Sequence, residues 1–161
     1  GWTVEVVAAV DVLPDAELLP LLRARWNSLR LRDAILPRLA RRPAVEDRAR
    51  YVEALDALDG EVVLAAAGAL RALDVSLSRA ELASVLASLR RACAAPELRA
   101  QREALVGLLK HSTGQAFDVR EPKGADLIAA YRPWFDWFAE AHPAEAARLG
   151  GATGVDLAAW G

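Results

Sequence analysis

The chain has 161 residues, a net charge of −2, 54% apolar residues and a single cysteine, Cys93. This length suits one domain, and a domain of this size buries about 70% of its unfolded surface, enough for a core without disulfides or metals. The charge balance argues against nucleic-acid binding and against attachment to an acidic membrane. No run of about 18 apolar residues is present that could cross a bilayer.

Basic residues are almost all arginine, because Lys110 and Lys123 are the only lysines among the 20 basic residues. With the abundant Ala, Leu and Asp, this composition indicates coding bias from a GC-rich genome and not an arginine-specific function. The chain contains no Met and begins Gly1-Trp2, which predicts an excised domain or a processed product of a longer protein.

The N-terminal part has apolar residues at helical spacing. Valine-rich residues 3–13 are compatible with strand or helix, and we favour a helix that closes an earlier repeat. Pro14-Asp15 then opens a helix, where proline is tolerated in the first turn. Three amphipathic helices are predicted here, over residues 15–29, 32–42 and 45–58.

Start and stop signals define the following helices. Asp59 is the expected N-cap of a helix through Leu73, and Ser78 with Glu81 forms a capping box. The signals predict helices over 59–73, from Ser78 to about Ala94, and over 96–111, with Gly114 as a left-handed stop.

Two helix patterns recur. Residues 59–73 match 94–108 at an offset of 35, with Leu70 aligned to Leu105 and Leu73 to Leu108. Another match, at an offset of 34, aligns Tyr51, Val52 and Leu55 with Val85, Leu86 and Leu89. Recurrence at such periods is the signature of stacked helix pairs that share a core.

These features predict an all-α fold, a short α-solenoid of about three helix pairs with a C-terminal aromatic capping helix. We divide the chain into repeats over 1–114, a connector and aromatic helix over 115–149, and a linker-like tail over 150–161.

An arginine-rich segment is the first candidate site. Between Arg23 and Arg50 there are nine arginines and three acids, a local charge of +6. If they share a face, they could hold a phosphate or an acidic partner. The favoured alternative is a solvated convex face on which arginine stems cover helix joints. The candidate residues are Arg23, Arg25, Arg30, Arg32, Arg38, Arg41 and Arg42.

Five aromatic rings within residues 131–138 form the second candidate site. They could dock a protein or a neighbouring domain. The favoured alternative is a cap over the exposed core of the last repeat. The rings belong to Tyr131, Trp134, Phe135, Trp137 and Phe138.

No catalytic, cofactor or metal site is expected. His111 and His142 have no ligand partner at metal spacing, and no phosphate loop, nucleophile elbow or haem motif is present. Cys93 follows a helical pattern and is expected to be an inert packed thiol.

Two resemblances refine this interpretation. Segments 17–22 and 62–73 resemble HEAT repeats, with Pro20 matching the proline of their first helix, although the D-x-x-x-x-R signature is poorly kept. Segments 31–43, 108–117, 131–143 and 149–161 are similar to the helical segment of large exported proteins of planctomycetes and their relatives. In those proteins the segment lies between a sugar-dehydrogenase-like β-propeller and a c-type cytochrome domain.

The resemblance implies a helical spacer of an exported or periplasmic redox protein. We therefore expect a non-enzymatic scaffold that contacts a protein or a neighbouring domain of the same parent chain. The alternative is a nucleic-acid-binding module of the HEAT-like DNA-glycosylase type, supported by the arginine-rich segment and opposed by the net charge. Nucleic acid is the less favoured partner.

Overall fold

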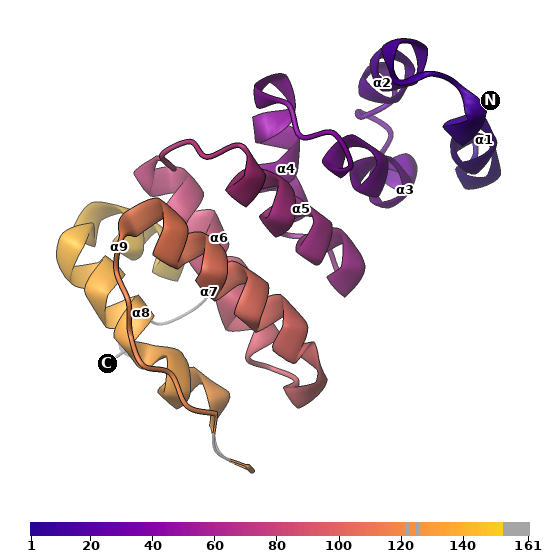
Figure 1. Cartoon of the computed structure of the whole chain (residues 1–161). Coiled ribbons are helices and arrows are strands. Elements are labelled where there is room, and N and C mark those ends of the chain that lie inside the picture. Colours follow the sequence, from indigo (N-terminus) through magenta and orange to yellow (C-terminus); the bar gives the residue numbers. More distant parts are fainter. Residues whose placement is uncertain (122, 125, 153–161) are drawn as a thin grey trace. The chain divides into compact units, whose positions relative to one another are not determined.

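The computed structural model describes residues 1–121, 123–124 and 126–152, and all regular structure in this part of the chain is helical (Figure 1). The all-α class is therefore confirmed. The α-helices are α1 (Val4–Ala9), α2 (Asp15–Ala24), α3 (Leu29–Ala40), α4 (Arg48–Ala54), α5 (Gly60–Ala72), α6 (Arg79–Ala92), α7 (Arg99–Thr113), α8 (Leu127–Ala141) and α9 (Pro143–Ala152). Short 3₁₀ helices are η1 (Val10–Val12), η2 (Val45–Asp47) and η3 (Pro96–Leu98).

The chain forms two compact units, Gly1–Asp74 and Val75–Gly161. The sequence was divided at 114 and 149, and these positions do not coincide with the boundary between the units. Each unit contains one pair of the recurring helices. Helix α4 packs against α5 in unit 1, and α6 packs against α7 in unit 2.

Unit 1 is organised around α3, which contacts α1, α2, α4 and α5. Its inward face carries Ile35, Leu36 and Leu39, all fully buried. The spacing of three and four residues places these side chains on one stripe of the helix, which explains why α3 is central to the core. Pro37 lies within α3 without ending it.

Unit 2 is organised around α6, which contacts α7, α8 and α9. Val85, Leu86 and Leu89 of α6 are fully buried, as are Leu105 and Leu108 of α7. Full burial of a leucine stabilises the folded chain by about 2 kcal/mol, so these stripes hold the unit together.

The local helix signals act as predicted. Asp59 accepts a hydrogen bond from the Glu61 amide, and Ser78 with Glu81 forms the capping box in both directions. Gly114 ends α7 with φ at 70°, in the left-handed region. The valine-rich N-terminus is helical over Val4–Ala9, as favoured over a strand.

Helix ends differ from the expectation in several places. Leu29 begins α3 instead of ending the preceding helix, and the helix expected over 45–58 is divided into η2 and the short α4. Gly150 and Gly151, expected in a linker-like tail, belong to α9. The rest of that tail, 153–161, lies outside the described residues.

Two glycines provide opposite tests of this helix geometry. Gly114→Ala should lower the free energy of unfolding by about 1 kcal/mol, because an L residue is strained at a positive φ. Gly68→Ala should raise it by about 0.5–1 kcal/mol, because Gly68 lies inside α5 with open space around it. Urea denaturation of both variants measures these changes in the free energy of unfolding. Changes of the same sign in the two variants would contradict the assigned geometry.

Candidate functional site

The arginine-rich segment forms ion pairs within unit 1. Five of the seven candidate arginines are paired: Arg23 with Glu46 and Asp47, Arg32 with Glu53, Arg38 and Arg41 with Asp11, and Arg42 with Asp15. Arg25 lies over the Trp2 ring at 5.2 Å from its centroid, and Arg30 is exposed. Glu46 and Asp47 belong to the segment itself, and Asp11, Asp15 and Glu53 from outside it offset part of its remaining charge. The geometry favours arginine stems that cover helix joints over a free anion-binding face.

The centre of this ion-pair system is the fully buried Asp47. Arg23 donates from Nε to both carboxylate oxygens at 3.0 and 3.1 Å, and from a terminal nitrogen at 2.8 Å. Arg50 adds a bond of 2.9 Å to Oδ1. The hydrogen bond to Asp47 is the main cause that raises the pKa of Arg23. Since Arg23 belongs to α2 and Asp47 precedes α4, the pair joins these two helices.

A second buried network organises unit 2 around Arg102, whose side chain is fully buried in the first turn of α7. Its Nε donates to Glu121 Oε1 at 2.7 Å and a terminal nitrogen donates to Oε2 at 3.1 Å. Further bonds of 2.7 Å reach the carbonyls of Ala92 and Ala95, and one of 3.0 Å reaches Pro96. The Tyr131 hydroxyl donates to Oε1 of Glu121, the oxygen that also accepts from Arg102 Nε.

Protonation in this network is fixed by its contacts. The Arg102 hydrogen bonds, aided by that of Tyr131, lower the pKa of Glu121 to about 2 against the effect of burial. Burial, followed by the bond to Glu121, raises the pKa of Tyr131. At neutral pH Glu121 is ionised and Tyr131 is protonated, so the network is a salt bridge with an added donor and has no group poised for proton transfer.

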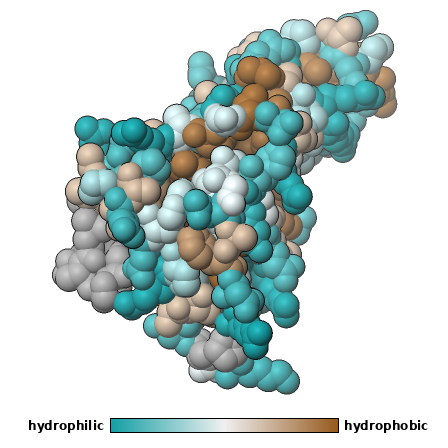
Figure 2. Space-filling view, turned by 60° about the vertical axis from the view of Figure 1, so that its left-hand side comes forward, coloured by the Kyte–Doolittle hydropathy of each residue, from teal (hydrophilic) through white to brown (hydrophobic). Residues whose placement is uncertain are grey.

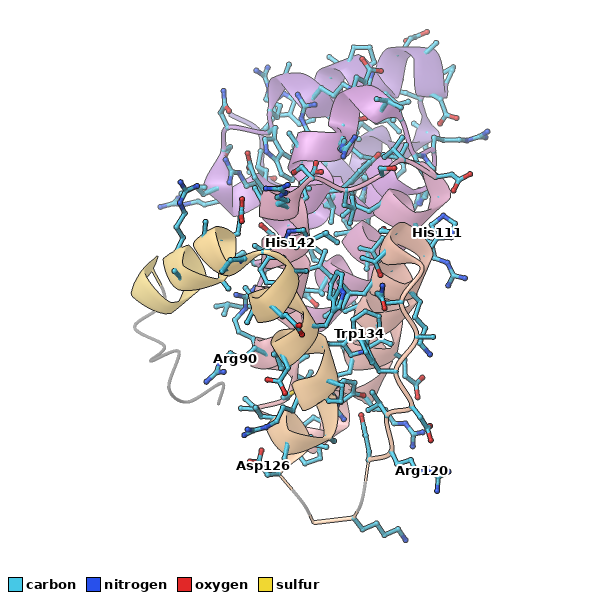
Figure 3. The ribbon with its side chains drawn as sticks, turned by 90° about the vertical axis from the view of Figure 1, so that its left-hand side faces the viewer. Arg90, His111, Arg120, Asp126, Trp134 and His142 are labelled. Atoms are coloured by element: carbon cyan, nitrogen blue, oxygen red, sulfur yellow. The ribbon has the colours of Figure 1, made fainter. Side chains whose placement is uncertain are left out.

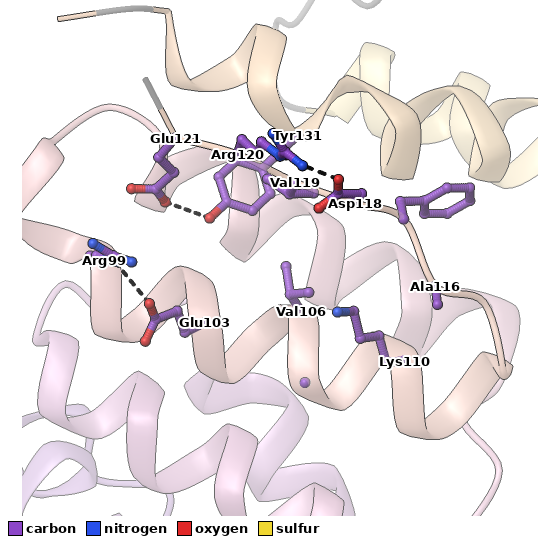
Figure 4. A pocket seen from close by; sticks show the side chains of 12 residues that line it. Arg99, Glu103, Val106, Lys110, Ala116, Asp118, Val119, Arg120, Glu121 and Tyr131 are labelled. Atoms are coloured by element: carbon purple, nitrogen blue, oxygen red, sulfur yellow. Dashed lines mark hydrogen bonds and ion pairs between the residues drawn. The ribbon is translucent and has the colours of Figure 1, made fainter. Parts of the chain in front are cut away.

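An open groove adjoins this network on the surface of unit 2 (Figure 4). Its volume is about 730 Å³, and it lies between α7 and the extended connector 115–121. Helix α7 contributes Arg99, Glu103 and Lys110, while Glu121 and Tyr131 lie on the other side. Arg99 is paired with Glu103 at 2.8 Å, so the groove wall is charged but mostly neutralised.

The aromatic cluster lies mainly in the core. Tyr131, Trp134, Phe135 and Phe138 are each at most 4% exposed. Trp134 packs edge-on against Phe117 of the connector, with ring centroids 4.8 Å apart. Figure 3 places Trp134 among the helices of unit 2. Four of the five rings are therefore enclosed by the fold, as the capping interpretation requires, and a docking surface could use only the half-buried Trp137.

Unit 1 has a small hollow that the sequence did not reveal. Its volume is about 180 Å³, and apolar atoms of Trp26, Ala54 and Val62 line it. Its acidic members are Asp33, Glu53 and Asp56, and its one basic member is Arg32. Glu53 forms an ion pair with Arg32 at 3.1 Å and accepts a hydrogen bond from the Trp26 ring nitrogen at 3.0 Å. The hollow thus combines an apolar floor with a negative rim.

Exposed apolar side chains accompany this hollow. Leu29 lines it and is 73% exposed, and Leu58, which follows the lining residue Ala57, is fully exposed. Brown apolar patches interrupt the mostly hydrophilic face in Figure 2. Within the described chain, the large apolar residues that are exposed all belong to unit 1: Val4, Val6, Val12, Leu21, Leu29, Val45 and Leu58.

The remaining reactive groups are enclosed or dispersed. Cys93 is buried, and desolvation raises its pKa to about 11, so its thiol is protonated at neutral pH. Among the described residues, no group of three or more His, Cys, Asp or Glu side chains could hold a metal ion. Over the same part of the chain, every helix is too short or too polar to cross a membrane.

Comparison with known proteins adds no relative. No protein-family model matches the chain, and no curated protein or solved structure matches it either. The HEAT and planctomycete resemblances therefore rest on the sequence segments alone.

Sequence reasoning missed Asp47, Arg102 and Glu121 as structural centres. One signal was present for Arg102, because it stands four residues after Leu98 and three before Leu105, on the apolar stripe of its helix. A charged residue at such a position must be paired when buried. Its partner Glu121 lies 19 residues away and carries no local signal.

The pKa of Glu121 gives a pH-dependent test. Its folded value of about 2 lies below the ordinary 4.5, so its stabilisation is complete above pH 4.5 and is lost as the pH falls towards 2. Glu121→Gln should therefore lower the free energy of unfolding at pH 7 by roughly 2 kcal/mol. The difference from wild type should shrink between pH 4.5 and pH 2, as measured by urea denaturation.

Glu103→Gln is the matched control, because Glu103 forms a solvent-exposed ion pair with Arg99, and both residues belong to α7. This variant should change stability little at any pH. A wild-type advantage over Glu121→Gln that stays constant down to pH 2 would contradict the assigned network.

Proposed function

We propose that this chain is a non-catalytic helical-repeat scaffold that binds a protein segment through the hollow of unit 1. The observation that carries the proposal is the combination of an apolar floor, an exposed leucine and an acidic rim at this hollow. Apolar side chains at protein surfaces mark interaction sites when they gather beside a pocket.

The charges of the rim define the partner. The lining holds the carboxylates of Asp33 and Glu53 and one guanidinium group, that of Arg32, which is already paired with Glu53. A segment with one apolar side chain beside Lys or Arg would fill the floor and complement the rim. The hollow is small, so we expect it to hold a single side chain of the partner and not a long helix.

The repeat architecture supports a scaffold role. We propose that α4–α5 and α6–α7 are two HEAT-like pairs, since their apolar positions recur at 34 and 35 residues. Under the planctomycete resemblance, the partner would be a neighbouring domain of an exported redox protein, and this chain would position that domain without redox chemistry of its own. The nucleic-acid alternative gains no support, because five of the seven arginines that suggested it are paired with carboxylates.

A short peptide with one leucine between lysines is a direct probe. Titrated into isotopically labelled protein, it should shift the amide resonances of Leu29, Ala57 and Val62 first, because these residues line the hollow. A matched peptide with glutamates in place of lysines should bind at least several-fold more weakly.

Two variants locate the interaction. Asp33→Asn should weaken the lysine peptide about fivefold at low salt, since one rim charge is lost. Asp136→Asn removes an exposed carboxylate from α8 of unit 2 and should leave the affinity unchanged. Resonance shifts that fall elsewhere, or equal binding of the two peptides, would refute the proposed site.

A further inference from the structure

The connector 115–121 follows the left-handed Gly114 and runs as an extended segment along unit 2. Its side chains alternate. Phe117, Val119 and Glu121 are half-buried, while Ala116, Asp118 and Arg120 are exposed, and this period of two is that of a β-strand. The segment therefore has the side-chain alternation of a strand, although no strand lies beside it in the described part of the chain.

The inward side chains hold this segment in place. Phe117 packs against Trp134 at 4.8 Å between ring centroids, and Glu121 accepts hydrogen bonds from Arg102 and Tyr131. On the opposite side, Asp118 and Arg120 form a 3.4 Å ion pair while their side chains remain 80% and 87% exposed. Figure 3 shows Arg120 pointing away from the helices.

Backbone groups of this segment are available for pairing. Over the part of the chain that the structure describes, the N–H and C=O groups of residues 116–121 make no hydrogen bond to other protein groups. A strand with an open edge is a template for another strand, and main-chain hydrogen bonds then supply the affinity.

We propose that residues 117–121 pair with the same residues of a second copy of this chain, as a two-stranded antiparallel ribbon with its two-fold axis at Val119. The charges of Asp118 and Arg120 favour a second copy as the partner and also favour this register. With the axis at Val119, Asp118 of each copy lies opposite Arg120 of the other, which makes two cross-strand ion pairs.

Other two-fold registers are less favourable. An axis at Asp118 places two carboxylates opposite each other, and an axis at Arg120 places two guanidinium groups opposite each other, which is destabilising. The exposed ion pair within one copy is weak, so exchanging it for cross-strand pairs costs little. The sequence Asp118-Val119-Arg120 is thus self-complementary in the antiparallel direction.

The contact is short, so the dimer is weak, with a dissociation constant on the order of 100 μM. It would present each binding surface of the chain twice, and two linked surfaces raise the avidity for a partner with two matching segments. This inference does not depend on the hollow of unit 1 and can hold or fail separately.

Sedimentation velocity over a range of protein concentrations tests the ribbon. Wild type should shift reversibly from monomer towards dimer. Asp118→Arg and Arg120→Asp should each weaken dimerisation at least tenfold, because each places like charges opposite each other in both pairs. Both side chains are exposed, so the helical circular dichroism of the variants should be unchanged.

Mixing the two single variants supplies the decisive result. In an equimolar mixture, the two arginines of the Asp118→Arg copy face the two aspartates of the Arg120→Asp copy, so a heterodimer should form with near wild-type affinity. The double variant, which keeps the wild-type net charge, should also dimerise. Glu140→Arg, an exposed change in α8, is the charge-reversal control and should dimerise as wild type does.

Three results would overturn the proposal. They are a wild type that stays monomeric at millimolar concentration, single variants that dimerise as wild type does, and a mixture in which no heterodimer forms. In the first case, the open edge would have to serve another extended segment, such as a partner peptide.

Discussion

The hydrogen bonds of Arg102 are the interaction on which unit 2 depends. One buried guanidinium group joins the end of α6, the turn before α7 and, through Glu121, the connector. Tyr131 extends the network to α8. A buried charge is tolerated only when its donors are satisfied. Among the described residues, the backbone of 116–121 makes no hydrogen bond to protein groups, so side chains hold this part of the connector.

In unit 1, a side-chain hydrogen bond joins two consecutive helices in a similar way. Tyr51 and Arg102 are each the fourth residue of a helix that follows a three-residue 3₁₀ turn. The Tyr51 hydroxyl donates to the Leu39 carbonyl near the end of α3, as Arg102 donates to the Ala92 carbonyl at the end of α6. In both units a polar side chain from the second helix donates to a carbonyl in the last turn of the first helix. Arg102 is fully committed to such a joint, so its charge is not available to a ligand.

The sequence predicted what depends on near neighbours. Asp59, Ser78 and Gly114 act within three or four residues, so their caps and stops could be identified directly. The aromatic helix was also identifiable, and four of its five rings are buried. The hollow and the ion-pair networks could not be identified in this way, because their members come together only through packing. Arg23 and Asp47 are 24 residues apart, and nothing local distinguishes them from the other charges.

The most direct test of this account is the backbone mobility of residues 115–121, measured by heteronuclear NOE in wild type and in Arg102→Lys. A lysine cannot reproduce the fork of a guanidinium group. We expect helix-like NOE values for the connector in wild type, and a fall to loop-like values in the variant while α6 and α7 stay rigid. A connector that is already mobile in wild type, or one that stays equally rigid in Arg102→Lys, would contradict the claim that this arginine fixes it.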